Sequence, residues 1–88
     1  MEIAFSSSFK RAFKKKIAGK KERENNFWRK IELFKDDPFD PQLKTHKLSG
    51  KLKDLWSFTL EYDLRVIFAF ADGKKVALVD IGNHKEVY

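Results

Sequence analysis

The sequence contains no cysteine, which excludes disulfide bonds and thiolate metal sites and fits a reducing compartment. Its two histidines, His46 and His84, are 38 positions apart and do not form a metal-binding motif. Its four glycines are isolated from one another, so there is no phosphate-binding glycine loop. No apolar run reaches the ~18 residues that cross a bilayer, and the N-terminus lacks a signal-peptide pattern. We therefore expect a soluble, cytoplasmic protein.

The length and the charge limit the architecture and the partners. The 88 residues predict one domain, residues 1–88, with room for a single core. The 19 Lys and Arg against 13 Asp and Glu give a net charge of +6. Eight of the basic residues lie between Lys10 and Arg23, where Glu22 is the only acidic residue. Such a field favours a polyanion or an acidic protein as partner, although the lysines could simply form a solvated helix face.

The beginning of the chain predicts a strand followed by a basic helix. Residues 1–6 alternate weakly between apolar and polar side chains, which indicates a short strand. Ser7 or Ser8 is expected to cap the helix that follows, and Gly19 to end it. Apolar residues recur at intervals of four on this otherwise lysine-covered helix and form one stripe: Phe9, Phe13 and Ile17.

A second helix is predicted from about Lys21 to Lys35, with Trp28 at the border of its apolar face. Pro38 and Pro41 follow and break the helix, because neither can donate a backbone hydrogen bond. Trp28 and Trp56 are interpreted as core residues rather than as binding platforms. The apolar face of the second helix is expected to pack on a sheet and consists of Phe27, Ile31 and Phe34.

The last part of the chain predicts three antiparallel strands joined by two hairpins. Asp72-Gly73 fits a two-residue type I′ turn, and the resulting register places Arg65 opposite Asp80. A three-residue loop, Glu61–Asp63, places Thr59 opposite Arg65. A polar row of these three residues would then cross the sheet. The other expected pairs are Ala71–Lys74, Ala69–Val76, Ile67–Leu78, Leu60–Leu64, Phe58–Val66 and Trp56–Phe68.

Alternation along these strands sorts their side chains into two faces. The polar row shares its face with an apolar patch of Ile67, Ala69, Val76 and Leu78. The other face is expected to be the core and carries Trp56, Phe58, Leu60, Leu64, Val66, Phe68, Ala77, Val79 and Ile81. The predicted fold is therefore α+β, in the order β-α-α-β-β-β, with a helical hairpin packed on one face of a small antiparallel sheet.

A candidate site lies at the end of the last hairpin. In an antiparallel hairpin the start of one strand lies beside the end of the next, so Asp63 and Arg65 are expected near Gly82 and His84, with Tyr88 further along beyond the last strand. Such a group suits cleavage of RNA by its own 2′-hydroxyl. One side chain takes the 2′ proton, another protonates the leaving 5′ oxygen, and the arginine stabilises the phosphorane. His46, before the sheet, supplies a second imidazole that titrates near neutral pH.

Each of these residues also has a purely structural interpretation. Arg65 can pair with Asp80 across the strands. His46 can tie a loop. His84 and Tyr88 can anchor the end of the chain.

A series of short motifs carries a family resemblance. In order along the chain they are Leu48-Ser49-Gly50, Trp56, Asp63–Phe68, Ile81–His84 and Val87-Tyr88. Their order and spacing resemble the RelE/ParE superfamily of bacterial toxins from type II toxin-antitoxin modules. With Asp37–Pro41 and His46 included, the sequence is most similar to the YafQ-like branch.

The resemblance implies a ribonuclease that cuts mRNA in the ribosomal A site by 2′-hydroxyl attack, without a metal or cofactor. It also implies an acidic antitoxin that wraps the toxin, and a complex of the two that binds operator DNA and represses its own synthesis. By position, it assigns the catalytic roles to His46, Asp63, Arg65, His84 and Tyr88. Four lysines near these residues are expected to bind RNA: Lys47, Lys51, Lys53 and Lys85.

Two positions depart from the family pattern. Thr59 stands where the YafQ-like branch has a further histidine, and Asp80 where it has an arginine. A carboxylate there would weaken phosphate binding and could neutralise Arg65. The alternatives are therefore a ParE-like toxin that acts on DNA gyrase without cutting RNA, and a non-toxic protein that keeps only its antitoxin partner.

Overall fold

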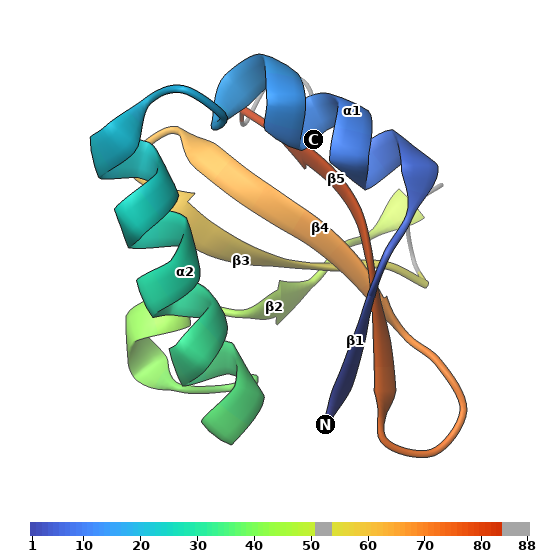
Figure 1. Ribbon diagram of the computed structural model, residues 1–88. Helices are drawn as coiled ribbons and strands as arrows, with labels where there is room; N and C mark the ends of the chain where they lie inside the picture. The colour runs from blue at the N-terminus through green and yellow to red at the C-terminus, as the bar shows by residue number, and fades with distance from the viewer. Residues whose placement is uncertain (51–53, 84–88) are drawn as a thin grey trace.

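The computed structural model describes residues 1–50 and 54–83 and has two α-helices packed on a five-stranded sheet (Figure 1). The strand order is β1-β5-β4-β3-β2. β1 runs parallel to β5, and the other neighbouring strands are antiparallel. The elements are β1 (Glu2–Phe5), α1 (Ser7–Lys16), α2 (Lys21–Asp36), the 3₁₀ turn η1 (Pro41–Leu43), β2 (His46–Lys47), β3 (Trp56–Glu61), β4 (Leu64–Phe70) and β5 (Lys75–Gly82).

The predicted α+β class and the pair of helices on the sheet are confirmed, and the sheet has two features that the sequence did not reveal. β1 joins as a parallel edge strand, so the sheet is mixed. A two-residue strand, β2, pairs with β3 at the other edge. A strand this short carries no alternating pattern that a sequence could display. Within the described ranges, no helix is long and apolar enough to cross a membrane.

Helix α1 begins earlier than expected, because Ser6 is its N-cap. The Ser6 backbone is extended (φ −69°, ψ 164°), and its Oγ accepts a hydrogen bond from the backbone N–H of Phe9 at 3.1 Å. The prediction of a cap at Ser7 or Ser8 is wrong, because both residues are already helical. The Ser8 hydroxyl instead donates to the carbonyl of Val79 and ties α1 to β5.

The main core lies between the helices and the sheet. The Phe34 ring lies 5.0 Å from the ring of Phe58 and 4.9 Å from that of Phe68, so aromatic contacts join α2 to the middle of the sheet. Trp28 is 50% exposed, and its interpretation as a core residue is wrong, because it lies beside the buried face of α2. That face is the predicted one, and each of its residues is at most 1% exposed: Phe27, Ile31 and Phe34.

The β3–β4 register is close to the prediction. Three predicted pairs are present: Trp56–Phe68, Phe58–Val66 and Thr59–Arg65. An irregularity after the last of these brings Glu61, rather than Leu60, opposite Leu64. The turn that joins the strands is therefore Tyr62-Asp63, one residue shorter than expected.

The β4–β5 register is one residue away from the prediction. The backbone N–H of Ala71 donates to the carbonyl of Lys75 at 2.8 Å, so the loop between them has three residues, 72–74, instead of two. Within this loop only Gly73 has a positive φ (65°), whereas a type I′ turn needs positive φ at both central residues. The pairs predicted for the start of β5 are wrong, and the observed pairs are Phe70–Val76, Ala69–Ala77 and Phe68–Leu78.

A bulge in β5 changes which side chains face the core. The pairing with β4 skips Val79, and one extra residue reverses the alternation along a strand. Before the bulge, Val76 and Leu78 are buried in the core, contrary to the prediction. After it, Ile81 is buried there as predicted. Val79 itself, predicted to be in this core, packs on the other face of the sheet.

The face of the sheet away from the helices has a small apolar cluster of its own. Ile67 is 4% exposed and Leu48 is 5% exposed, and Leu55 and Val79 pack against them. The N–H of Leu48 donates to the carbonyl of Leu55 at 2.9 Å, which joins these two residues directly. The expectation of a single core is therefore wrong, because Leu48 and Leu55 cover part of the face that the helices leave open.

Candidate active site

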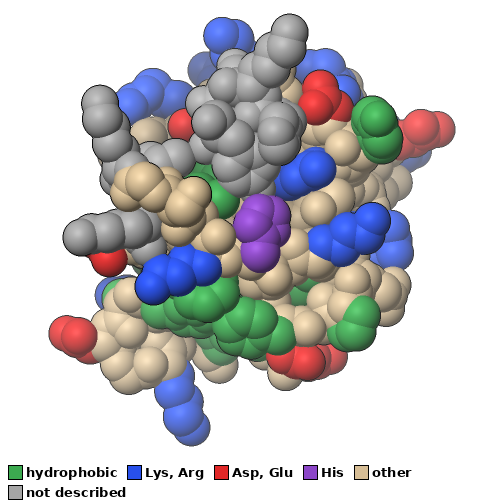
Figure 2. Space-filling model, turned by 180° about the vertical axis from the view of Figure 1, so that it is seen from behind, with side chains coloured by type: hydrophobic (Ala, Val, Ile, Leu, Met, Phe, Trp, Pro, Cys, Tyr) green, Lys and Arg blue, Asp and Glu red, His purple; other side chains and the backbone are tan. Residues whose placement is uncertain are grey.

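Two neighbouring rows of cross-strand pairs bring polar side chains to the sheet face away from the helices. In one row, His46 lies opposite Ser57 on β3. In the next row, two residues further along β3, Thr59 lies opposite Arg65. Paired residues share a face, and so do residues two apart on one strand, so His46 and Arg65 lie on the same side of the sheet. Figure 2, a view from behind the helices, shows a histidine side chain near the centre, with Lys and Arg side chains on both sides.

The turn between β3 and β4 fixes Arg65. Its Nη1 donates to the carbonyl of Glu61 at 3.2 Å and to that of Tyr62 at 3.0 Å. On β5 its opposite residue is Gly82, so the predicted row of Thr59, Arg65 and Asp80 is wrong at its third position. The longer hairpin loop and the bulge each shift β5 by one residue relative to β4. Gly82, at the end of β5, therefore takes the position opposite Arg65 that was predicted for Asp80.

Asp80 is engaged away from Arg65. It lies opposite Ile67, and its Oδ1 accepts a hydrogen bond from the backbone N–H of Ile81 at 2.8 Å. The structural interpretation of Arg65 as the ion-pair partner of Asp80 is therefore wrong. Asp80 still lies on the same face of the sheet as Arg65, because Ile67 and Arg65 are two residues apart on β4, so its carboxylate remains a diagonal neighbour of the arginine.

His46 stands on the exposed edge strand β2, after a closely held loop. The Thr45 hydroxyl donates to the carbonyl of Pro38. Lys44 then turns the chain in a left-handed conformation, with a φ of 51°. The Nδ1 of His46 lies 3.2 Å from the carbonyl oxygen of Lys44. A ring that donates from Nδ1 to this carbonyl keeps Nε2 as its basic nitrogen.

Asp63 is exposed in the β3–β4 turn and lines a polar hollow of about 240 Å³. Arg23 crosses this hollow, because its Nε donates to Oε2 of Glu61 at 3.2 Å and its Nη1 to the Lys16 carbonyl at 3.0 Å. Asn83, directly after β5, is part of the same lining. The sequence did not single out Lys16 or Arg23, because nothing distinguishes them within a run of similar basic residues.

The remaining predicted site residues fall into two groups. Lys47 is exposed, but it lies opposite Trp56 and so belongs to the sheet face opposite to that of His46. The other five predicted residues lie outside the described residues: Lys51, Lys53, His84, Lys85 and Tyr88.

Within the part of the chain that the structure describes, no three His, Asp or Glu side chains gather in a way that could hold a metal ion.

Comparison with protein families finds one family that matches the whole chain. Residues 1–88 match the family described as "Bacterial toxin of type II toxin-antitoxin system, YafQ". The chain belongs to the YafQ family of toxins. This assignment confirms the predicted relation to the RelE/ParE superfamily and to its YafQ-like branch. No curated protein matches this YafQ-family toxin.

Solved toxin structures share the fold. YafQ from E. coli strain BL21(DE3) superposes with a TM-score of 0.77 at 21% identity, over 99% of this chain and 97% of that one. A YoeB/ParE toxin from Agrobacterium tumefaciens has a TM-score of 0.79 at 16% identity, over 96% and 99% of the two chains. The E. coli DinJ-YafQ complex gives a TM-score of 0.69 at 19% identity, over 99% and 97%. At such identities the likeness is one of fold, and the family match carries the assignment.

Proposed function

We propose that this YafQ-family toxin is an endoribonuclease that cuts mRNA in the ribosomal A site. The observation that supports the proposal is that His46 and Arg65 share the sheet face away from the helices. His46 and Arg65 are separated by two strand spacings across the sheet and by two residues along the strands. Standard sheet spacings then put their Cα atoms roughly 12 Å apart. Both side chains extend from this face, so a phosphodiester between them is within reach of each.

The proposed reaction needs one acid and one base. The 2′-hydroxyl oxygen of a ribose attacks the adjacent phosphorus, and the bond from phosphorus to the 5′ oxygen of the next nucleotide breaks. A base removes the 2′ proton, and an acid protonates the leaving 5′ oxygen, so the products are a 2′,3′-cyclic phosphate and a 5′-hydroxyl. His46 and His84 are the proposed acid and base, because an imidazole ring has one nitrogen that can accept a proton and another that can donate one.

Arg65 is the proposed stabiliser of the phosphorane. Negative charge grows on the phosphoryl oxygens in the transition state, and a cation that is already in position stabilises it. Among the described residues, the guanidinium uses only Nη1, toward the carbonyls of Glu61 and Tyr62. Nε and Nη2 are thus available to a phosphate, in the paired geometry that arginine offers and lysine does not.

The other proposed site residues are Asp63, Tyr88 and several lysines. Asp63 lies in the turn that holds Arg65 and is the one carboxylate of the proposed catalytic residues. Tyr88 is proposed to stack on a base or to donate to the phosphate. Three lysines are proposed to bind the RNA backbone: Lys51, Lys53 and Lys85. Lys47 is left out of this set, because it lies on the other face of the sheet.

The proposed protein partner is an acidic antitoxin. YafQ of E. coli has been solved in complex with DinJ, and YoeB of Staphylococcus aureus in complex with YefM. The net charge of +6 favours an acidic partner for this chain as well. We expect the toxin to act in the cytoplasm and to meet operator DNA only through the antitoxin complex.

The proposal is tested by mapping RNA ends in bacteria that express the toxin. The wild type should arrest translation and produce new 5′ ends within coding sequences. Arg65→Ala should slow cleavage of ribosome-bound mRNA by about 10²–10³-fold, the usual effect of losing one prearranged transition-state donor. His46→Ala and His84→Ala should each relieve toxicity. Full toxicity in both Arg65→Ala and His84→Ala would reject the mechanism.

Matched variants separate catalysis from charge and from folding. Lys74→Ala removes one exposed positive charge in the loop at the far end of the β4–β5 hairpin, and should leave cleavage unchanged. Arg65→Lys keeps the charge without the paired donors, and should fall between the wild type and Arg65→Ala. Because Arg65 also holds the β3–β4 turn, the melting temperature of each variant is measured beside its activity.

The two alternatives predict other outcomes. A toxin that acts on DNA gyrase should abolish DNA supercoiling without new RNA ends. The departure from the family pattern at Asp80 motivates this alternative. A non-toxic protein should leave growth unaffected and still bind its acidic partner.

A further inference from the structure

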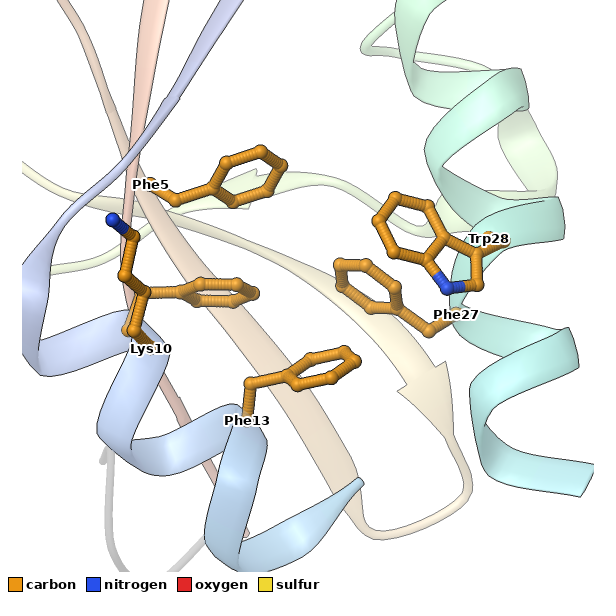
Figure 3. Close-up of a pocket in the computed structure, with 6 residues that line it drawn as sticks. Phe5, Lys10, Phe13, Phe27 and Trp28 are labelled. Atoms are coloured by element: carbon orange, nitrogen blue, oxygen red, sulfur yellow. The ribbon is translucent and has the colours of Figure 1, made fainter. Parts of the chain in front are cut away.

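A hollow lined by aromatic rings opens between α1 and α2 (Figure 3). Its volume is about 190 Å³. The nuclease chemistry proposed above does not involve it, because that site lies on the other face of the sheet. The residues that line this aromatic hollow are Phe5, Phe9, Lys10, Phe13, Phe27 and Trp28.

The rings of the aromatic hollow hold one another in place. The Phe13 ring lies 5.1 Å from that of Phe27, which lies 4.9 Å from that of Trp28, both in edge-on contact. Phe9, at 2% exposure, lies 5.9 Å from Phe27, at 0% exposure, so the floor of the hollow is part of the main core. A recess formed in advance binds a side chain without the cost of ordering its own walls.

The rim of the aromatic hollow is exposed. Trp28 is 50% exposed and Phe5 is 38% exposed. They stand on different elements, α2 and β1, with the hollow between them (Figure 3). Large aromatic side chains that gather around one exposed recess mark interaction sites, whereas scattered ones do not. Tryptophan is also among the residues that contribute most to binding at protein interfaces.

The helix beside the aromatic hollow has charge of one sign. Every charged side chain of α1 (Ser7–Lys16) is basic, and Lys10 itself lines the hollow. An uncharged apolar ligand would make no favourable electrostatic contact with the basic side chains of α1. An acidic segment with one protruding apolar side chain fits both features, because its carboxylates lie along α1 while the apolar group fills the hollow.

We infer that the aromatic hollow receives an apolar side chain from an acidic, amphipathic segment of the antitoxin; the inference rests on the partner proposed above. The aromatic hollow is on the helix side of the sheet, whereas His46 and Arg65 face the other side. Anchoring at the hollow therefore leaves the RNA site open, and a different part of the antitoxin covers that site. Contacts at the aromatic hollow therefore contribute to the affinity for the antitoxin, and contacts on the other face of the sheet block the RNA site.

The test compares two aromatic residues of similar exposure. Trp28→Ala removes a wall of the aromatic hollow, and Phe39→Ala removes a ring that is 52% exposed and lies in the segment after α2. The probe is the purified product of the gene adjacent to the toxin gene, titrated by calorimetry. Trp28→Ala should weaken binding by about 30-fold or more, as truncation of a central interface residue does, and Phe39→Ala by less than threefold. Both variants should cut mRNA at the wild-type rate.

The charge and the competing occupants are tested with the same probe. Lys14→Glu on α1 should weaken binding and make it less sensitive to salt, whereas Lys74→Glu should not.

Binding by Trp28→Ala at wild-type strength would overturn the inference. So would slower mRNA cleavage with unchanged antitoxin affinity, which would make the hollow an RNA surface, or loss of self-association alone, which would make it a dimer contact. If the wild type binds no such protein, the proposed partner fails, and the inference fails with it, while the nuclease proposal stands on its own test.

Discussion

The two faces of the sheet are covered to different extents, and the difference separates stability from function. On the helix side, Phe34, Phe58 and Phe68 are 0% exposed and pack ring against ring. On the other side, Leu48 and Ile67 form a small buried cluster, and His46 and Arg65 lie on the same face. A fully covered face contributes most of the buried apolar area. A face with partial cover leaves polar side chains accessible to a substrate on a rigid support.

The largest expected effect is on the helix side. Phe34→Ala should lower the free energy of unfolding by about 3–5 kcal/mol, because it leaves a cavity between α2 and the sheet. Small domains have a total stability of roughly 5–15 kcal/mol, so much of this variant should be unfolded at 37 °C. Urea unfolding followed by circular dichroism measures the loss. A loss below about 1 kcal/mol would mean that the helix side is not the main source of stability.

A smaller and matched effect compares one methyl group on each face. Ile31→Val removes a methyl group from the main core, where Ile31 is 1% exposed, and Ile67→Val removes one from the far face, where Ile67 is 4% exposed. Both changes should cost about 0.5–1.5 kcal/mol. Ile67→Val should cost less, because the cluster around Ile67 is small and its partly buried side chains, Leu55 and Val79, can shift into the space. An equal or greater cost at Ile67 would show that the far face is packed as firmly as the helix side.

The smallest expected effect concerns Lys30 on α2, whose Nζ donates to the Gln42 carbonyl at 3.1 Å. Burial lowers the pKa of Lys30, and the neighbouring charges of Arg29 and Lys44 lower it further, while Asp40 acts in the opposite direction. Since the pKa is lower in the folded state, the unfolded state binds more protons in the alkaline range. The contribution of Lys30 to stability should therefore rise as the pH increases through its folded pKa.

The Lys30 prediction is checked by titration and by unfolding. In NMR, the Cε signal of Lys30 should titrate below the ordinary lysine value of about 10.4. In urea unfolding between pH 8 and pH 10, the wild type should gain stability relative to Lys30→Gln, which lacks the titrating group. A Lys30 midpoint at or above the ordinary value would contradict the prediction.

Sequence reasoning worked best where a residue's position follows from local periodicity. The spacing of Phe27, Ile31 and Phe34 correctly predicted the buried face of α2, because 3.6 residues per turn leave only one face for them. The pairing of Thr59 with Arg65 was also predicted correctly, although the expected turn was one residue too long, because an irregularity before the turn compensates for the difference. For the candidate site, the sequence named His46 and Arg65, and the structure places them on one face of the sheet. Their catalytic roles stay a prediction.

The errors cluster where one residue more or less changes the geometry. Asp72-Gly73 has the residues of a two-residue turn, yet the chain closes the loop one residue later, at Lys75. No residue type marks the bulge at Val79. Together these two shifts moved Asp80 away from Arg65 and brought Gly82 beside it. The partner of the arginine was therefore not readable from the sequence.

By itself the sequence determined the order of the elements apart from β2, the apolar faces of the helices and the family, because periodicity and motif order are properties of the chain taken a few residues at a time. Only the tertiary structure decided which side chains of β5 face the core, that Trp28 borders an exposed hollow, and that His46 and Arg65 share one open face. The physical reason is that register depends on loops and bulges. Their geometry is selected by how well whole faces pack, and one residue of slip turns a strand over.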